Sequence, residues 1–157
     1  MSHVTAADMD ALVLQAKSNS RRRQHLNLHA SPEEPSQRLL NAVCLDSYIR
    51  PHRHIHAETD ECLLAIRGRF ALVQFDDTGG VVAVHRFGAG EATGIVQVSP
   101  AVWHTVLALT EDAVLFEAKS GPYIADQAKT FASWAPEEGA SEQLVYLQKL
   151  RDIVSAS

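Results

Sequence analysis

Short apolar runs separated by turn residues dominate the middle of this sequence. From Ser47 onward, runs of five to eight residues rich in Val, Ile, Leu and Phe recur between turn signals such as Asp76-Asp77-Thr78-Gly79-Gly80, where glycine tolerates positive φ. The runs predict strands near residues 47–56, 61–67, 69–76, 81–87, 93–98, 103–109 and 113–119. Many short strands without intervening helices indicate a mainly β protein, a sandwich or barrel, rather than a parallel α/β sheet.

Each end of the chain carries a helical pattern instead. Thr5 followed three residues later by Asp8 is a capping-box signal, and it predicts a helix over residues 5–18. The apolar residues that then recur at helical spacing are Met9, Leu12, Val13 and Ala16. Near the C-terminus, the same spacing predicts a final amphipathic helix through Leu144, Leu147 and Leu150.

The segments between the first helix and the β region are less regular. Residues 21–35 are polar and rich in proline, so we expect a loop with at most one short strand. Residues 37–43 fit either a helix or a strand. We therefore expect one domain: residues 1–35 pack as a helix and polar segment on a barrel of residues 36–140, and residues 141–157 form the last helix.

The composition narrows the class of protein. The 157 residues are enough for one core, and 14 Lys+Arg against 19 Asp+Glu give a formal charge of -5, which argues against a general nucleic-acid or acidic-membrane surface. No apolar stretch reaches transmembrane length and no leader pattern opens the sequence, so a cytoplasmic protein is expected. Cys44 and Cys62 lack CxxC spacing, and free thiols are expected.

Histidines stand at every second position at His52, His54 and His56. In a strand, alternate side chains share a face, so the three imidazoles would project together. Glu61 across a hairpin and His104 from a later strand would complete a nitrogen and oxygen donor set for one divalent transition metal, such as Zn, Fe, Mn or Ni. Any two adjacent histidines could reach one metal, so the pair stays open between His52/His54 and His54/His56.

The same alternation predicts what else lines the cavity. Tyr48 and Arg50 share parity with His52 and should point into the barrel if Pro51 does not break the phase of the strand. A buried arginine needs a partner. Arg50 would either pair with Glu61 or another acid, or bind an anionic substrate with its planar guanidinium.

Two motifs resemble those of the cupin superfamily. His54-x-His56, Glu61 and Gly68 resemble its first motif, in which two histidines and a glutamate bind a metal inside a jelly-roll barrel. Ser99-Pro100-Ala101-Val102-Trp103-His104 resembles a degraded second motif, with Ser99 and Ala101 in place of the usual proline and glycine. The resemblance implies a cupin-type jelly roll, also called a double-stranded β-helix.

Longer blocks resemble the WbuC family of cupin-fold metalloproteins over about residues 8–139. They include Leu26-Asn27-Leu28-His29, Gln37-Arg38-Leu39-Leu40-Asn41-Ala42, Tyr48-Ile49-Arg50-Pro51-His52-Arg53-His54, Trp103-His104-Thr105-Val106, Phe116-Glu117-Ala118-Lys119-Ser120-Gly121-Pro122-Tyr123 and Trp134-Ala135-Pro136-Glu137-Glu138-Gly139. In that family the histidine pair follows the proline, which implies His52 and His54 with Glu61 and His104 as ligands and leaves His56 as the alternate. It also makes Lys119 and Tyr123 possible pocket residues.

The WbuC family takes its name from a bacterial surface-polysaccharide gene cluster, which implies a sugar context such as O-antigen biosynthesis. We expect a metal-dependent enzyme acting on a small sugar-like or anionic molecule, of isomerase or epimerase type. The alternatives are a non-catalytic sugar-binding or regulatory cupin, and an iron-dependent dioxygenase. We also expect a homodimer, because cupin-type sheets often cover an edge strand with a partner subunit. The sequence assigns no catalytic residue.

Overall fold

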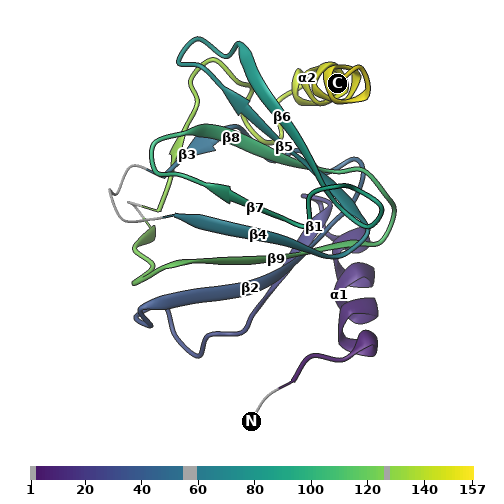
Figure 1. The fold of residues 1–157 in the computed structure, drawn as a ribbon, viewed down its shortest axis with the longest axis vertical. Helices are drawn as coiled ribbons and strands as arrows, with labels where there is room; N and C mark the ends of the chain where they lie inside the picture. The colour runs from purple at the N-terminus through teal and green to yellow at the C-terminus, as the bar shows by residue number, and fades with distance from the viewer. Residues whose placement is uncertain (1–2, 55–59, 126–127) are drawn as a thin grey trace.

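The computed structural model describes residues 3–54, 60–125 and 128–157 (Figure 1). Within them, ten strands form two five-stranded antiparallel sheets, which we call sheet A (β1-β2-β9-β4-β7) and sheet B (β10-β3-β8-β5-β6). The elements are α1 (Ala6–Ser18), β1 (Arg23–Asn27), β2 (Ser36–Val43), β3 (His52–Arg53), β4 (Glu61–Arg67), β5 (Arg69–Phe75), β6 (Val81–Gly88), β7 (Ile95–Val98), β8 (Trp103–Ala108), β9 (Ala113–Ser120), β10 (Thr130–Phe131) and α2 (Gln143–Ser155). The predicted mainly β jelly roll with a helix at each end is confirmed.

Strand β5 shows how one strand supports two layers. Phe70 and Leu72 point between the sheets into the central core, while Ala71 and Val73 point outward into a second core. Both faces are therefore buried, which explains why this run is almost continuously apolar instead of alternating with polar residues. The inner core also contains Val43, Leu63, Phe87, Val96, Val98, Val106, Ala108, Ala113 and Leu115.

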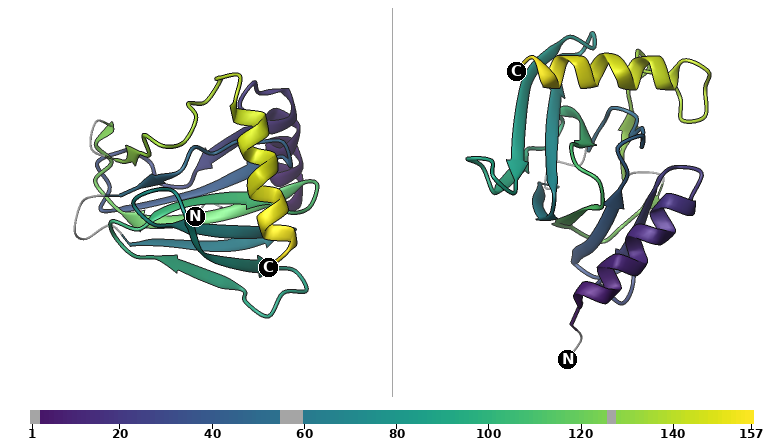
Figure 2. Two further views of the ribbon diagram at one scale, coloured as in Figure 1. Left: turned by 90° about the horizontal axis from the view of Figure 1, so that it is seen from above. Right: turned by 90° about the vertical axis from the view of Figure 1, so that its right-hand side faces the viewer.

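The helices cover the outer faces of the two sheets, one on each side (Figure 2). On sheet A, Leu12, Val13 and Ala16 of α1 pack with the outward-facing Leu40 and Ala42 of β2. On sheet B, α2 supplies Leu147, Leu150 and Val154 to the outer core. The predicted capping box of α1 is present, since the Thr5 hydroxyl accepts from the Asp8 amide and Asp8 Oδ2 accepts from the Thr5 amide.

Three segments test the predictions made from the sequence for residues 21–35, 37–43 and 47–56. Of the predicted strand over residues 47–56, the described part, residues 47–54, contains only β3, because Pro51 has no amide hydrogen for a ladder and Tyr48 packs in the outer core. The polar segment 21–35 does contain one short strand, β1, and residues 37–43 form a strand. Neither helix of the described chain is both long and apolar enough to cross a membrane.

Truncating an inner-core leucine should destabilise the fold strongly. Leu72 is 1% exposed, and Leu72→Ala should lower the free energy of unfolding by about 2–5 kcal/mol through lost burial and a residual cavity. Leu14 of α1 is 65% exposed, so Leu14→Ala is the matched control and should change it by less than about 0.5 kcal/mol. Urea unfolding measures both, and equal effects would contradict this assignment of the core.

Candidate metal centre

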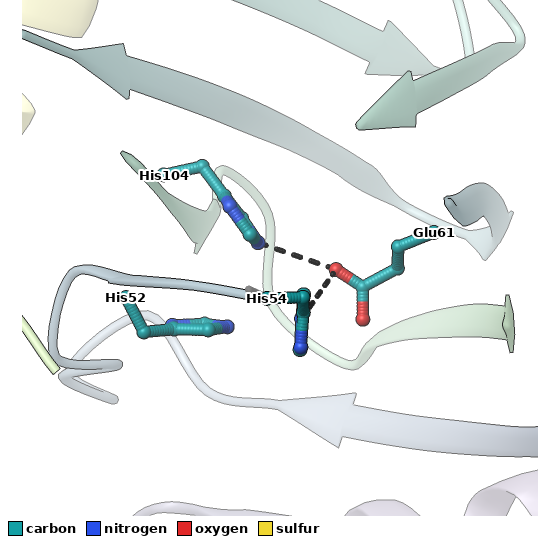
Figure 3. A group of neighbouring side chains, drawn as sticks. All are labelled: His52, His54, Glu61 and His104. Atoms are coloured by element: carbon teal, nitrogen blue, oxygen red, sulfur yellow. Dashed lines mark hydrogen bonds and ion pairs between the residues drawn. The ribbon is translucent and has the colours of Figure 1, made fainter. Parts of the chain in front are cut away.

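Four side chains that the sequence singled out lie together at one end of the barrel. One potential ligand atom from each of His52, His54, Glu61 and His104 lies within 4.8 Å of those of the other three. All four side chains are buried, from His104 at 1% to His52 at 6% exposed. In Figure 3 they converge on a common space, with Glu61 facing His54 and His104.

Strand pairing brings these residues together from both sheets. On sheet B, His52 of β3 is opposite His104 of β8, and their ring centroids are 4.5 Å apart. Glu61 opens β4 on sheet A. His54 follows β3, where its carbonyl accepts a hydrogen bond from the Ala101 amide at 2.8 Å. His56 lies outside the described residues, so the structure does not compare it with His52 as a partner of His54.

Backbone carbonyls fix the orientation of all three imidazoles. The Nδ1 atoms of His52, His104 and His54 lie 3.0, 2.9 and 2.5 Å from the carbonyl oxygens of Arg50, Val102 and Ala128 respectively. Because a carbonyl can only accept, each Nδ1 must be the donor. A neutral ring then keeps its lone pair on Nε2, and this outer hydrogen bond is the arrangement typical of histidines that bind metals through Nε2.

The charge state of the cluster also suits a cation. Burial, together with the neighbouring Lys129 and His104, lowers the pKa of His52 well below its usual value, so this ring is neutral at pH 7. Burial alone would raise the pKa of Glu61, but the positive charge of Lys119 beside Oε1 holds that pKa well below its usual range, so the carboxylate is ionised. An ionised carboxylate beside imidazole nitrogens is a metal donor set.

The histidine nitrogens that face the Glu61 carboxylate also suit a bound metal ion. His54 Nε2 is buried, forms no hydrogen bond within the described residues, and lies 3.6 Å from Glu61 Oε2. His104 Nε2 lies 3.2 Å from the same oxygen. If the nitrogens are unprotonated, lone pairs face a carboxylate oxygen across these gaps, and a cation between them would satisfy both. These four residues could therefore hold a metal ion.

A buried lysine holds the other oxygen of Glu61. Lys119 Nζ lies 3.4 Å from Glu61 Oε1 and 2.5 Å from Glu117 Oε1. Burial lowers the pKa of Lys119, but the two carboxylates outweigh it and the pKa is raised, so the ammonium is retained. Burial and the neighbouring Glu61 raise the pKa of Glu117. Glu61 is thus fixed with Oε2 toward the imidazoles and Oε1 toward Lys119.

The cluster opens onto a cavity of about 370 Å³ between the sheets. Its apolar lining includes Ile49, Leu63, Val106 and Leu115. Its polar lining includes Glu117 and Lys119 beside the cluster, Tyr123 and Lys129 from the segment after β9, and His25, Asn27 and Asn41 from β1 and β2. The predicted pocket residues Lys119 and Tyr123 therefore do line this cavity.

Tyr48 and Arg50 lie elsewhere, so the prediction that they point into the cavity is wrong. The Tyr48 hydroxyl donates to the Pro136 carbonyl at 2.8 Å within the outer core. Arg50 donates from Nε and Nη2 to the Ala132 carbonyl at 3.2 and 2.8 Å. The parity argument fails because β3 begins only at His52, after Pro51, and the preceding residues do not follow its alternation.

Sequence reasoning missed the polar contribution of the N-terminal segment. No pattern in the sequence assigned a role to His25 or Asn41, although both line the cavity. The signal was the alternation of Arg23, His25 and Asn27 within a short strand. It was hidden because an edge strand with one face on a polar cavity lacks the apolar period that marks most strands.

Comparisons with known proteins place this geometry in a fold family. A family model described as "Domain of unknown function (DUF6016)" matches residues 4–87. A search of the curated proteins found no match. Solved structures with the same fold include KdgF from Halomonas sp., with a TM-score of 0.50 and 17% identity over 66% of this chain and 82% of that chain.

Two larger proteins share the fold over part of their length. The capsular polysaccharide assembling protein CapF from Staphylococcus aureus has a TM-score of 0.55 and 14% identity over 69% of this chain and 29% of that chain. Oxalate decarboxylase from Bacillus subtilis has a TM-score of 0.52 and 14% identity over 69% of this chain and 27% of that chain. The chain thus spans less than a third of either protein. These cupin-fold neighbours show a cupin-type jelly roll.

The contacts of Arg50 predict a structural role that substitution can test. Lysine cannot reproduce the two-nitrogen contact with the Ala132 carbonyl, so Arg50→Lys should lower the free energy of unfolding by about 1–2 kcal/mol with metal binding unchanged. Arg67→Lys is the control, because Arg67 pairs with the exposed Asp10 and should matter little. Unchanged stability in Arg50→Lys would refute the structural role.

Proposed function

The chain belongs to the family described as Domain of unknown function (DUF6016), and we propose that it is a metal-dependent cupin enzyme acting on a small sugar-like or anionic molecule. His52, His54, Glu61 and His104 hold one divalent transition metal in this proposal. The reaction class we propose is isomerisation or epimerisation, in which a proton leaves one carbon of the ligand and returns to the same or a neighbouring carbon.

One observation carries the proposal: three oriented imidazoles and an ionised carboxylate converge at the inner end of a cavity. Four protein ligands can also form a structural zinc site, in which no position is left for a substrate. This cluster, however, adjoins a cavity of about 370 Å³ that could hold one. A bound metal would polarise a carbonyl oxygen of the ligand and so acidify the neighbouring C–H, or would bind a hydroxyl oxygen and so acidify its O–H. His/Glu donors suit Zn, Fe, Mn and Ni alike.

Side chains beside the cluster can handle the proton. Glu117 shares a hydrogen bond with Lys119 at 2.5 Å, and both line the cavity. Because burial and Glu61 raise its pKa, Glu117 is closer than an exposed carboxylate to the range in which a group both takes and returns a proton. Tyr123, which is 47% exposed, lies at the same cavity and can donate a hydrogen bond to the ligand.

The sugar context rests on resemblance rather than on the site. The sequence blocks similar to the WbuC family, and the likeness in fold to a capsular polysaccharide assembling protein, support a place in surface-polysaccharide chemistry. The cavity itself supports an oxygen-rich ligand, because polar side chains occupy much of its lining.

Metal binding is the first test. The double substitution His52→Ala and His54→Ala should abolish stoichiometric metal, since it removes two of four donors, while the β core stays folded. The control pairs His3→Ala with His85→Ala, two exposed histidines, and should retain one equivalent. Elemental analysis with circular dichroism reads both. Full metal retention in the His52/His54 variant would refute the ligand assignment.

Metal-dependent exchange of a ligand hydrogen is the second test. Thermal-shift screening of sugar phosphates, nucleotide sugars and small carboxylates should give hits that a chelator removes. In D2O, NMR should then show deuterium entering such a ligand at the carbon beside its carbonyl, because the abstracted proton exchanges with solvent. Binding without exchange would favour the non-catalytic sugar-binding cupin, and the absence of any metal-dependent hit would overturn the small-molecule function.

A further inference from the structure

Polar side chains recur on the inner face of sheet A well beyond the metal cluster, among apolar ones such as Leu39 and Leu115. Asn41 lies in β2, between β1 and β9, and is half-buried with its side chain in the cavity. Its neighbours Leu40 and Ala42 face the other way, against α1. Directly opposite Asn41 on β1 is His25, followed on the same face by Asn27. We call His25, Asn27 and Asn41 the polar row.

The hydrogen-bonding groups of the polar row are unused within the described part of the chain. None of the three side chains forms a hydrogen bond there. Two other polar side chains of the cavity are committed: Gln37 Nε2 donates to two backbone carbonyls at 2.9 and 3.1 Å, and His29 Nδ1 lies 3.0 Å from the Arg38 amide. Asn41 points inward from an interior strand, where an apolar side chain would pack better. Hydrogen bonds from a bound ligand to Asn41 would offset this loss of packing.

The strand register places the polar row far from the metal cluster. Glu61, Lys119 and Gln37 are opposite one another across β4, β9 and β2. Asn41 lies four residues further along β2 from Gln37, so strand geometry puts its Cα roughly 16 Å from that of Glu61. Beyond the row, Arg23 and Glu138, which form an ion pair, also line the cavity. A single sugar ring is too short to contact both the cluster and the row.

We propose that the cavity binds an extended hydroxylated ligand of at least two sugar-like units, with one end at the metal cluster and the second unit hydrogen-bonded by His25, Asn27 and Asn41. This rests on the proposed function. Asparagine and neutral histidine each both donate and accept hydrogen bonds, as hydroxyl groups do. The row carries no fixed charge, so it matches neutral hydroxyls rather than a second anionic group.

Sugar acids of one and two units with the same carboxylate end test the length of the ligand. Calorimetry on the zinc-loaded protein would compare gluconate with maltobionate, cellobionate and lactobionate. At least one of the two-unit acids should bind about 10-fold more tightly than gluconate, since a few neutral hydrogen bonds supply that much. If all three bind no more tightly than gluconate, the extended-ligand inference is overturned.

Substitutions in the polar row locate the second unit. Asn41→Leu and His25→Leu should each lower the affinity for the preferred two-unit acid by about 3- to 10-fold and leave gluconate binding unchanged. His85→Leu, at an exposed position of β6, is the control and should bind both ligands normally. Metal content and melting temperature confirm that each variant is folded. Equal affinity in the wild type and both row variants would overturn the assignment.

The two proposals fail in different ways. Metal-dependent gluconate binding without any advantage for two units would leave the metal-dependent function standing and remove only the extended ligand. If neither gluconate nor any two-unit acid binds in a metal-dependent manner, the inference that the cavity binds an extended sugar acid is overturned. The broader screen of phosphates and nucleotide sugars then decides the proposed function separately.

Discussion

The contacts of the Glu61 carboxylate join the two sheets at the end of the barrel that holds the metal cluster. Oε2 faces imidazoles from β8 and from the segment after β3, and Oε1 faces Lys119 of β9. The inner apolar core does not include these residues, so at this end the two sheets meet through polar contacts. A buried carboxylate is costly without positive partners. The four side chains must therefore stay in register, and a cation held among them would join both sheets.

Packing on the outer face of sheet B supports β3 and β8, the strands that carry His52 and His104. Trp103 and His104 are adjacent in β8, and the alternation of the strand sends the indole outward into the α2-covered core and the imidazole inward. Arg53, between His52 and His54, stacks on Trp103 with Cζ 4.3 Å from the ring, and Asp77 accepts the indole N–H at 2.9 Å. Packing outside the barrel thus limits movement of the histidines inside it.

Local periodicity predicted the parts of the site that lie on regular strands. The shared face of His52 and His54 follows from alternation, and Glu61 follows from hairpin distance. His104 was predicted as a lone histidine on a later strand, and the preference for His52 over His56 came from the family resemblance. Arg50 could not be placed this way, because its side chain depends on the Ala132 carbonyl, 82 residues further along the chain. Ala101 is a second feature that the sequence pattern did not reveal. It adopts φ 63 at a position where the cupin motif usually has glycine, so the backbone turn is kept although the glycine that normally marks it is absent.

The polar lining of the cavity follows from how the barrel divides its apolar residues. Phe70, Phe87 and Leu72 fill the inner core, and α1 covers the outward face of β2 with a separate cluster. Val43 at the end of β2 belongs to the inner core, but His25 and Asn41 belong to neither core, so these two inward positions need not be apolar for the fold to be stable. Asn41 and His25 are therefore free to serve binding. A face that contributes little to stability is where a jelly roll can change its ligand without changing its fold.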